Sequence, residues 1–176
     1  MKNIFNVILG AALLLPIFSS AQIIDPEAKL KELGIQLITP VPPIANYLKA
    51  VRVGNMVYLS GHGPDKPGGG SVTGKVGKDI TVEQAIDAAR LTGISLLSTL
   101  KATIGDLNKV KRIVRVFGMV NAVDTFTQHP KVINGCSDLL VQVFGENGKH
   151  ARCAVGMCSL PMNISVEIEM IVELKE

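Results

Sequence analysis

Arg152 is the residue of this chain whose type and position most clearly suggest chemistry. It lies in a short run of small and β-branched residues, His150 to Gly156, between the polar turn Glu146 to Lys149 and the break at Leu160-Pro161. Such a run predicts a strand. An arginine is unusual there, because half-buried strands favour apolar or β-branched side chains. Its guanidinium can hold a carboxylate or phosphate through two parallel hydrogen bonds, or it can simply lie over its own sheet as an edge arginine.

Two acidic residues alternate with apolar ones in the run Val166 to Leu174. The alternation predicts a strand with Val166, Ile168, Met170 and Val172 on one face and Glu167, Glu169, Ile171 and Glu173 on the other. Glu167 can accept a proton from water. It can equally be a solvated strand-face glutamate, and the residue alone leaves both readings open.

The remaining polar residues do not form a metal or nucleic-acid site by spacing. No third ligand stands near His62 or His150 at a suitable distance along the chain, so both are predicted to be loop histidines and no metal is expected. Three cysteines with no C-x-x-C pair predict small buried hydrophobes and no disulfide framework: Cys136, Cys153 and Cys158. The basic stripe Lys109, Lys111 and Arg115 has no aromatic residues interleaved for base stacking, so it is interpreted as a solvated strand face.

The elements that must position these residues can be read from turn and cap signals. Thr81 to Gln84 forms a capping-box pattern that predicts a helix running to about Thr103 and ending at Gly105. Pro130 opens a second helix, which Gly145 closes. A shorter helix is predicted from Asp25-Pro26 to Leu33. The remaining β-rich runs are Ala50–Val53 and Met56–Ser60, joined by Gly54-Asn55, and Val110–Val120.

The order of the main elements is therefore β-β-α-β-α-β-β, which predicts an α+β fold with one mixed sheet and two helices packed on one face. On the Arg152 strand we expect Cys153, Val155 and Met157 to meet the helices. Arg152, Ala154, Gly156 and Cys158 are then expected on the open face beside Glu167 and Glu169, covered by another subunit. On the long strand, Val110, Val114 and Val116 are expected to share one face with Arg112.

The first 21 residues have the pattern of a secretory signal peptide. Lys2 precedes an apolar stretch, Ile4 to Phe18, and Ser19-Ser20-Ala21 supplies small residues for cleavage. The sequence thus predicts a signal peptide at 1–21, a single domain at 22–176, and an exported, periplasmic or secreted protein that has no membrane anchor after cleavage. The formal charge of +3 for the whole chain includes Lys2. A mature chain this close to neutral argues against a general polyanion or nucleic-acid binder.

Several motifs in this order resemble the Rid/YjgF family of reactive-intermediate deaminases, in the branch labelled chorismate-mutase-like or endoribonuclease. The resemblance covers about Leu30 to Glu173. The motifs that carry it are Ala45-Asn46-Tyr47, Val53 to Gly61, Gly74 to Gly77, Thr81-x-x-Gln84-Ala85, Asn121 to Phe126, His129-Pro130-x-Val132-x-Asn134-Gly135, His150-Ala151-Arg152, Leu160-Pro161 and Val166 to Glu169.

The resemblance implies a chorismate-mutase-like fold, a homotrimer and a cleft between subunits for a small carboxylate-bearing ligand. It also implies a 2-iminobutanoate/2-iminopropanoate deaminase-like hydrolase, which converts 2-imino or enamino acids to 2-oxo acids and ammonium without a cofactor. Arg152 matches the carboxylate-binding arginine and Glu167 the glutamate that positions water. The cleft is lined by residues matching Tyr47, Ser60, Gly61 and Asn134. Each of Tyr47 and Asn134 can also be an ordinary packing or surface residue.

Gly156 departs from the pattern, because many deaminases of the family carry glutamate at that place. A trimeric carboxylate-binding protein without catalysis is therefore a second hypothesis. An endoribonuclease is a third, and both the near-neutral charge and the lack of a His/Lys catalytic pair argue against it. For the assembly, we expect Arg152 of one subunit to lie near the Tyr47 arm or the Asn134 region of the next.

Overall fold

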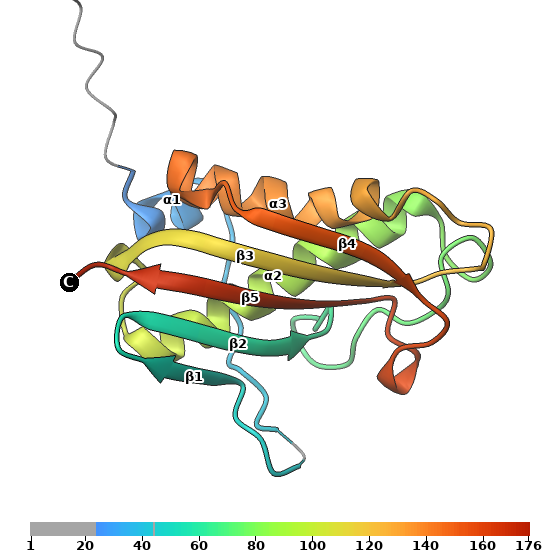
Figure 1. The fold of residues 1–176 in the computed structure, drawn as a ribbon, viewed down its shortest axis with the longest axis horizontal. Helices are drawn as coiled ribbons and strands as arrows, with labels where there is room; N and C mark the ends of the chain where they lie inside the picture. The colour runs from blue at the N-terminus through green and yellow to red at the C-terminus, as the bar shows by residue number, and fades with distance from the viewer. Residues whose placement is uncertain (1–23, 44) are drawn as a thin grey trace, which may run out of the picture.

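Five strands form one sheet in the order β1-β2-β5-β3-β4 in the computed structural model, which describes residues 24–43 and 45–176 (Figure 1). In the view of Figure 1, α2 runs behind the sheet, and α3 lies beside β4 at the edge opposite β1. The elements are α1 (Pro26–Glu32), β1 (Ala50–Val53), β2 (Met56–His62), α2 (Val82–Ile104), β3 (Val110–Asn121), α3 (His129–Phe144), β4 (Ala151–Met157) and β5 (Val166–Leu174), with short 3-10 turns at Leu107–Lys109, Gly145–Gly148 and Pro161–Asn163.

The predicted α+β class, with a mixed sheet, is confirmed. The β1-β2, β2-β5 and β3-β5 pairs are antiparallel. Only β3 and β4 run parallel, and α3 is the crossover between them, as a parallel pair requires. The predicted signal peptide at 1–21 lies outside the described residues. Within residues 24–43 and 45–176, the helices are all too short or too polar to cross a membrane.

Local signals place the element ends as expected. Thr81 accepts a hydrogen bond from the backbone of Gln84 at 3.2 Å, and the Gln84 side chain accepts one from the Thr81 backbone at 2.9 Å. These two bonds satisfy donors that the first turn of a helix leaves free. Gly105 ends α2 with a φ of +84°, and Gly54 turns the β1-β2 hairpin with a φ of +60°. Both are backbone conformations that glycine adopts without strain.

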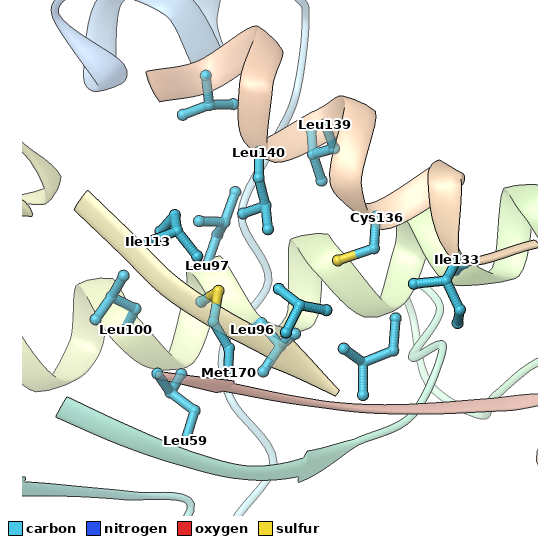
Figure 2. Packing of buried hydrophobic residues seen from close by; sticks show 14 of the residues in the cluster. Leu59, Leu96, Leu97, Leu100, Ile113, Ile133, Cys136, Leu139, Leu140 and Met170 are labelled. Atoms are coloured by element: carbon cyan, nitrogen blue, oxygen red, sulfur yellow. The ribbon is translucent and has the colours of Figure 1, made fainter. Parts of the chain in front are cut away.

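The core lies between the sheet and the two long helices. Figure 2 shows Ile133, Cys136, Leu139 and Leu140 of α3 directed toward leucines of α2 and toward Ile113 and Met170 of the sheet. The helices approach closely at Gly135, where a Cβ atom would collide with the backbone carbonyl of Ile86. The sheet also approaches α3 closely at Gly118 of β3, where a Cβ atom would collide with the side chain of Ile133. This closeness matters for the residues of β4 next to β3.

The predicted faces of β3 are wrong, because two irregularities interrupt its alternation. Register shifts between β3 and β5 occur at Val110/Arg112 and at Ile113/Arg115. As a result Ile113 is fully buried with Val110 and Val116, while Val114 is only half-buried. A bulge of this kind adds one residue and inverts the side-chain faces beyond it.

The predicted faces of β4 are also wrong, and Arg152 lies on the helix side of the sheet instead of the open face. In the parallel register Arg152, Ala154 and Gly156 lie beside Val116, Gly118 and Val120, which are buried under the helices. A Cβ atom on Gly156 would collide with the imidazole of His129, the first residue of α3. Small residues face α3 because the helix lies so near to this edge strand. The larger Cys153, Val155 and Met157 therefore turn to the open face.

The cysteine prediction holds for one residue of three. Cys136 is fully buried in the core, and burial raises the pKa of its thiol to about 12. Cys153 is half-buried on β4 and Cys158 is exposed beyond it. The prediction failed for these two because β4 is an edge strand, covered on one face only.

Candidate functional site

Arg152 is held by helix α3 through a single nitrogen of its guanidinium. Nη1 donates one hydrogen bond to Asn134 Oδ1 at 2.7 Å and a second to Ser137 Oγ at 3.1 Å. Asn134 and Ser137 are three residues apart on the helix and so lie on one face of it. Among residues 24–43 and 45–176, Nε and Nη2 have no hydrogen-bond partner. The guanidinium is thus fixed in place with one edge free to bind a carboxylate in two-bond geometry.

A histidine, His150, contacts the same serine as Arg152. His150 is half-buried, and its Nδ1 lies 2.7 Å from the carbonyl oxygen of Gly148. Its Nε2 lies 3.1 Å from Ser137 Oγ, the same atom that accepts from Arg152. Burial lowers the pKa of His150, the charge of Arg152 lowers it further, and the Gly148 carbonyl partly opposes both effects. The predicted loop histidine therefore belongs to the polar cluster Asn134, Ser137, His150 and Arg152.

Glu167 occupies a different environment on β5. Its carboxylate lies over Gly61, where a Cβ atom on that glycine would collide with Oε1. A glycine is needed there for this close approach. Burial raises the pKa of Glu167, and the negative charge of Glu169 raises it further. No hydrogen bond or ion pair from residues 24–43 and 45–176 satisfies this carboxylate. Such a group holds its proton more readily than an ordinary glutamate and is suited to exchange one with a ligand or water.

A cavity of about 800 Å³ opens beside Glu167. Its size lies within the range of about 300–1,000 Å³ that is typical of small-molecule sites. Its wall includes Tyr47, Gly61, Glu167 and Met162, together with apolar residues of the arm that precedes β1 and the glycine-rich loop after β2. Met162 is exposed and has a φ of +52°, a strained value for a residue with a side chain. The predicted residues Tyr47, Gly61 and Glu167 are thus brought together.

His62 belongs to the same wall and was predicted wrongly as a loop histidine. It ends β2 and is buried, with Nδ1 at 2.7 Å from the Ser60 carbonyl and Nε2 at 2.8 Å from Thr99 Oγ1. Because a carbonyl can only accept, Nδ1 carries the proton and Nε2 accepts from the threonine hydroxyl. Burial lowers the pKa of His62, so the ring is neutral and packs the end of β2 onto α2.

Ser60 has a structural contact and does not line the cavity. Its hydroxyl donates a hydrogen bond of 2.7 Å to the carbonyl oxygen of Leu48. Through this bond Ser60 secures the segment that carries Tyr47 into the cavity wall. Ser60 also borders a smaller hollow of about 270 Å³ on the open face, with Tyr58 and Arg115.

The predicted site residues fall into two groups that do not meet within one chain. Arg152 and Asn134 lie at the β4 edge on the side of the helices. Glu167, Gly61 and Tyr47 lie on the open face, across β3. The expected pairing of Arg152 with Glu167 and Glu169 on one face is therefore wrong. Arg152 also contacts Asn134 of its own chain. The expected approach of a neighbouring subunit to Arg152 stays a prediction.

Ser137 of the polar cluster and His129 at the start of α3 were not singled out from the sequence. Ser137 could have been found, because it follows Asn134 by one helical turn and faces the same way. His129 lies on Gly156, and its ring meets the edge of Phe126 with 5.0 Å between ring centroids. Gly156 was the sequence feature that could have indicated His129. A glycine on β4 leaves room for a side chain from the start of the helix opposite.

Comparisons with known proteins point to one family. The family described as "YjgF/chorismate_mutase-like, putative endoribonuclease" matches residues 27–174. The chain is 42% identical to protein TCP17 of Trypanosoma cruzi over 84% of this chain and 92% of that protein. It is 31% identical to a Dermatophagoides farinae protein named 2-iminobutanoate/2-iminopropanoate deaminase, over 76% and 89%. A crystal structure of a protein of unknown function from Agrobacterium tumefaciens superimposes with a TM-score of 0.80 at 45% identity, covering 85% and 92%.

Proposed function

The chain belongs to the YjgF/chorismate-mutase-like family, and from that premise we propose that it hydrolyses reactive 2-imino or enamino acids to 2-oxo acids and ammonium. A related protein bears the name of such a deaminase. The observation that carries the proposal is Glu167, a half-buried carboxylate with a raised pKa and no partner among the described residues, on the wall of a substrate-sized cavity.

The reaction needs little more than these groups. The carbon of a protonated imine is already electrophilic, so the protein has only to orient the substrate and a water molecule. In this proposal the free edge of Arg152 holds the substrate carboxylate. Glu167 accepts a proton from water as the water oxygen bonds to the imine carbon. Glu167 then returns this proton to the nitrogen, and the carbon–nitrogen bond breaks to release ammonia. The hydroxyl group loses its proton to Glu167, which passes it to ammonia, so the products are the 2-oxo acid and ammonium.

We further propose that the active assembly is a homotrimer with its site shared between subunits. The two groups of residues lie on different sides of one chain, so a small substrate can touch both only if a second subunit supplies one of them. The open sheet face also exposes Val51, Val53 and Tyr58 by 46%, 62% and 46%. An apolar area of this kind favours burial against another copy.

Mixed assemblies test the shared site. Arg152→Gln and Glu167→Gln chains, each inactive alone, are co-expressed with different tags and purified through both. We expect hydrolysis of enzymatically generated 2-iminobutanoate to return to about a third of the wild-type value, because every mixed trimer has one site in three that receives both intact groups. No recovery would contradict a shared site, and no activity of the wild-type chain would contradict the deaminase itself.

The matched control pairs two variants from the same half of the site. Arg152 and Asn134 are hydrogen-bonded within one chain. Mixed assemblies of Arg152→Gln with Asn134→Ala chains therefore contain no chain with an intact Arg152–Asn134 pair, and we expect no comparable recovery. Light scattering of the wild-type protein should give three times the mass of one chain.

One observation favours a second candidate, a carboxylate-binding protein without catalysis. The place of Gly156 is filled by the ring of His129, so no acidic side chain stands on the Arg152 face of β4. Thermal shift with 2-oxobutanoate separates the two functions. Stabilisation together with turnover supports the deaminase, whereas stabilisation without turnover supports the binding protein.

We also propose that residues 1–21 are removed during export, so that the protein acts outside the cytoplasm. The support is the charge and apolar pattern of that segment. N-terminal sequencing of protein recovered from the source cells should begin at Gln22, and a start at Met1 or Lys2 would contradict export.

A further inference from the structure

We propose that Ser137 and His150 are positioning residues for Arg152, and that through Ser137 the imidazole of His150 fixes the direction in which the guanidinium presents its free edge. The inference rests on carboxylate binding at Arg152, as in the proposed function, and does not depend on catalysis. Nothing in the sequence pattern assigned a role to Ser137, and His150 was expected to be a loop residue.

The hydrogen bonds form one chain whose donor directions can be assigned. The carbonyl oxygen of Gly148 can only accept, so Nδ1 of His150 carries a proton and donates to it at 2.7 Å. In the neutral ring Nε2 then has a lone pair, and it accepts the hydroxyl proton of Ser137 at 3.1 Å. This leaves the lone pairs of Ser137 Oγ for Nη1 of Arg152, also at 3.1 Å. The guanidinium can only donate, and the tautomer of His150 gives the hydroxyl proton of Ser137 an acceptor at Nε2 while Ser137 Oγ accepts from Nη1.

The surroundings keep His150 in this neutral form. It is half-buried, Arg152 is the positive charge that acts on it, and both effects lower its pKa. The other titratable groups nearby do not supply a counter-charge. Cys136 of α3 is a buried neutral thiol, and Lys149 is paired with Glu146 at 2.7 Å. Asp138 of α3 is exposed, and no hydrogen bond or ion pair joins it to His150.

Ligand binding at Arg152 should therefore change the pKa of His150. Protonation of His150 removes the acceptor at Nε2, so a ligand that needs the guanidinium held in this way binds preferentially to the neutral ring. By linkage, binding should lower the pKa of His150 further, and the affinity should fall as the pH falls through that pKa. The coupling runs through Ser137, which touches both side chains.

A double-mutant cycle tests the chain of contacts, with 2-oxobutanoate as the probe and the full chain as the protein. Ser137→Ala removes one of the two acceptors for Nη1, and His150→Phe keeps an aromatic ring but removes both nitrogens, the Nε2 acceptor among them. We expect each variant to weaken binding about tenfold, as for a lost hydrogen bond to a charged group. The double variant should also lose about tenfold rather than a hundredfold, because both changes break the same chain.

Two further variants make the test specific. Ser137→Thr keeps the hydroxyl and should retain most of the affinity. Thr103→Ala removes an α2 hydroxyl that bonds only the Thr99 carbonyl of its own helix, and it should change nothing. The pKa of His150, followed by NMR, should fall on adding 2-oxobutanoate to the wild-type chain and should not move in Arg152→Gln.

Several results would overturn the inference. They are a hundredfold loss in the double variant, a His150 pKa that 2-oxobutanoate leaves unchanged, or no binding of 2-oxobutanoate by the wild-type chain. The proposed deaminase fails differently. If 2-oxobutanoate binds and the cycle is non-additive, yet no imine is hydrolysed, the positioning role stands and the catalytic proposal falls.

Discussion

The charged groups of the Arg152 region and the Glu167 region differ in exposure and in hydrogen bonding. Arg152 is exposed, yet two acceptors from α3 hold it. Glu167 is half-buried, yet it lies over Gly61 without a hydrogen bond from the described residues, and its pKa is raised. A held guanidinium with a free edge is prepared for binding. A carboxylate left without partners in a cavity is prepared to exchange a proton.

The sheet topology explains how one small fold produces both environments. The parallel β3-β4 pair requires a crossover, and the crossover helix α3 lies over the edge strand, where it supplies acceptors to Arg152. At the other side, the β2-β5 register shifts between Leu59 and His62. This irregularity brings Gly61 under Glu167. Two local departures from a plain antiparallel sheet thus create the two environments.

The largest effect that would sharpen this contrast is expected from Glu167→Gln. Replacing a general base by a neutral amide should lower kcat by about 10²–10⁴-fold. Binding of 2-oxobutanoate should change little, because the Arg152 region is untouched. Measuring kcat with 2-iminobutanoate and affinity for 2-oxobutanoate on the same preparation checks both, and an active Glu167→Gln variant would remove the assigned role.

The same substitution should make the protein more stable at neutral pH. The folded-state pKa of Glu167 is raised, so the folded protein binds the proton more tightly than the unfolded chain does. Ionised Glu167 therefore opposes folding above its folded pKa, and this penalty disappears as the pH falls below the unfolded value of about 4.3. Urea titrations should show a stability gain for Glu167→Gln at pH 7–8 that vanishes near pH 4.

A smaller effect is expected from Arg152→Lys, in which the positive charge stays but the fork-shaped pair of donors is lost. We expect kcat/KM to fall by about 10²-fold, mostly through KM, since the change weakens the hold on the carboxylate. Thermal stability should stay close to wild type because the side chain is exposed. A variant with unchanged KM would show that the free edge does not bind the substrate.

The elements of this fold could be predicted because their signals are local. Thr81, Gly105 and Gly54 mark element ends through caps and turns that act over a few residues. The strand Val166 to Leu174 could be predicted with its faces, because a central strand covered on one side shows strong contrast between apolar and acidic residues.

The faces of β3 and β4 could not be predicted, for two different physical reasons. On β3, register shifts depend on the partner strand and leave no mark in the sequence of β3 itself. On β4, the closeness of α3 selects small residues for the inner face, which reverses the rule that larger apolar residues point inward. The resemblance to a family supplied the candidate site residues. Their division into two groups on different sides of the chain needed the three-dimensional arrangement.

A modest shift in pH dependence is expected from Glu169→Gln. Glu169 is exposed, and its charge contributes to the raised pKa of Glu167. Removing that charge should lower the pKa of Glu167, so the base is available at lower pH. The acid limb of the kcat/KM profile should move to lower pH with the plateau nearly unchanged. A limb that stays in place would show that Glu167 is not the group that titrates in the reaction.

The smallest effect is expected at the other end of the Arg152 face, in Gly156→Ala. The added methyl would meet the ring of His129, which must then leave its edge contact with Phe126. Overpacking of this kind typically costs about 1–3 kcal/mol, and we expect the lower end because the obstacle is a side chain and not backbone. Urea unfolding of the variant measures this cost.

The background variant His129→Ala decides whether the ring is the cause. Removing the ring takes away the three atoms nearest to the added methyl, and the ordinary gain of about 0.5–1 kcal/mol for replacing a strand glycine by alanine should emerge. Gly156→Ala should therefore destabilise the wild-type chain and stabilise the His129→Ala chain. Gly156→Ala could instead lower the free energy of unfolding equally in the wild-type and His129→Ala chains. That result would contradict the contact with His129 and would support the open-face position first predicted for Gly156.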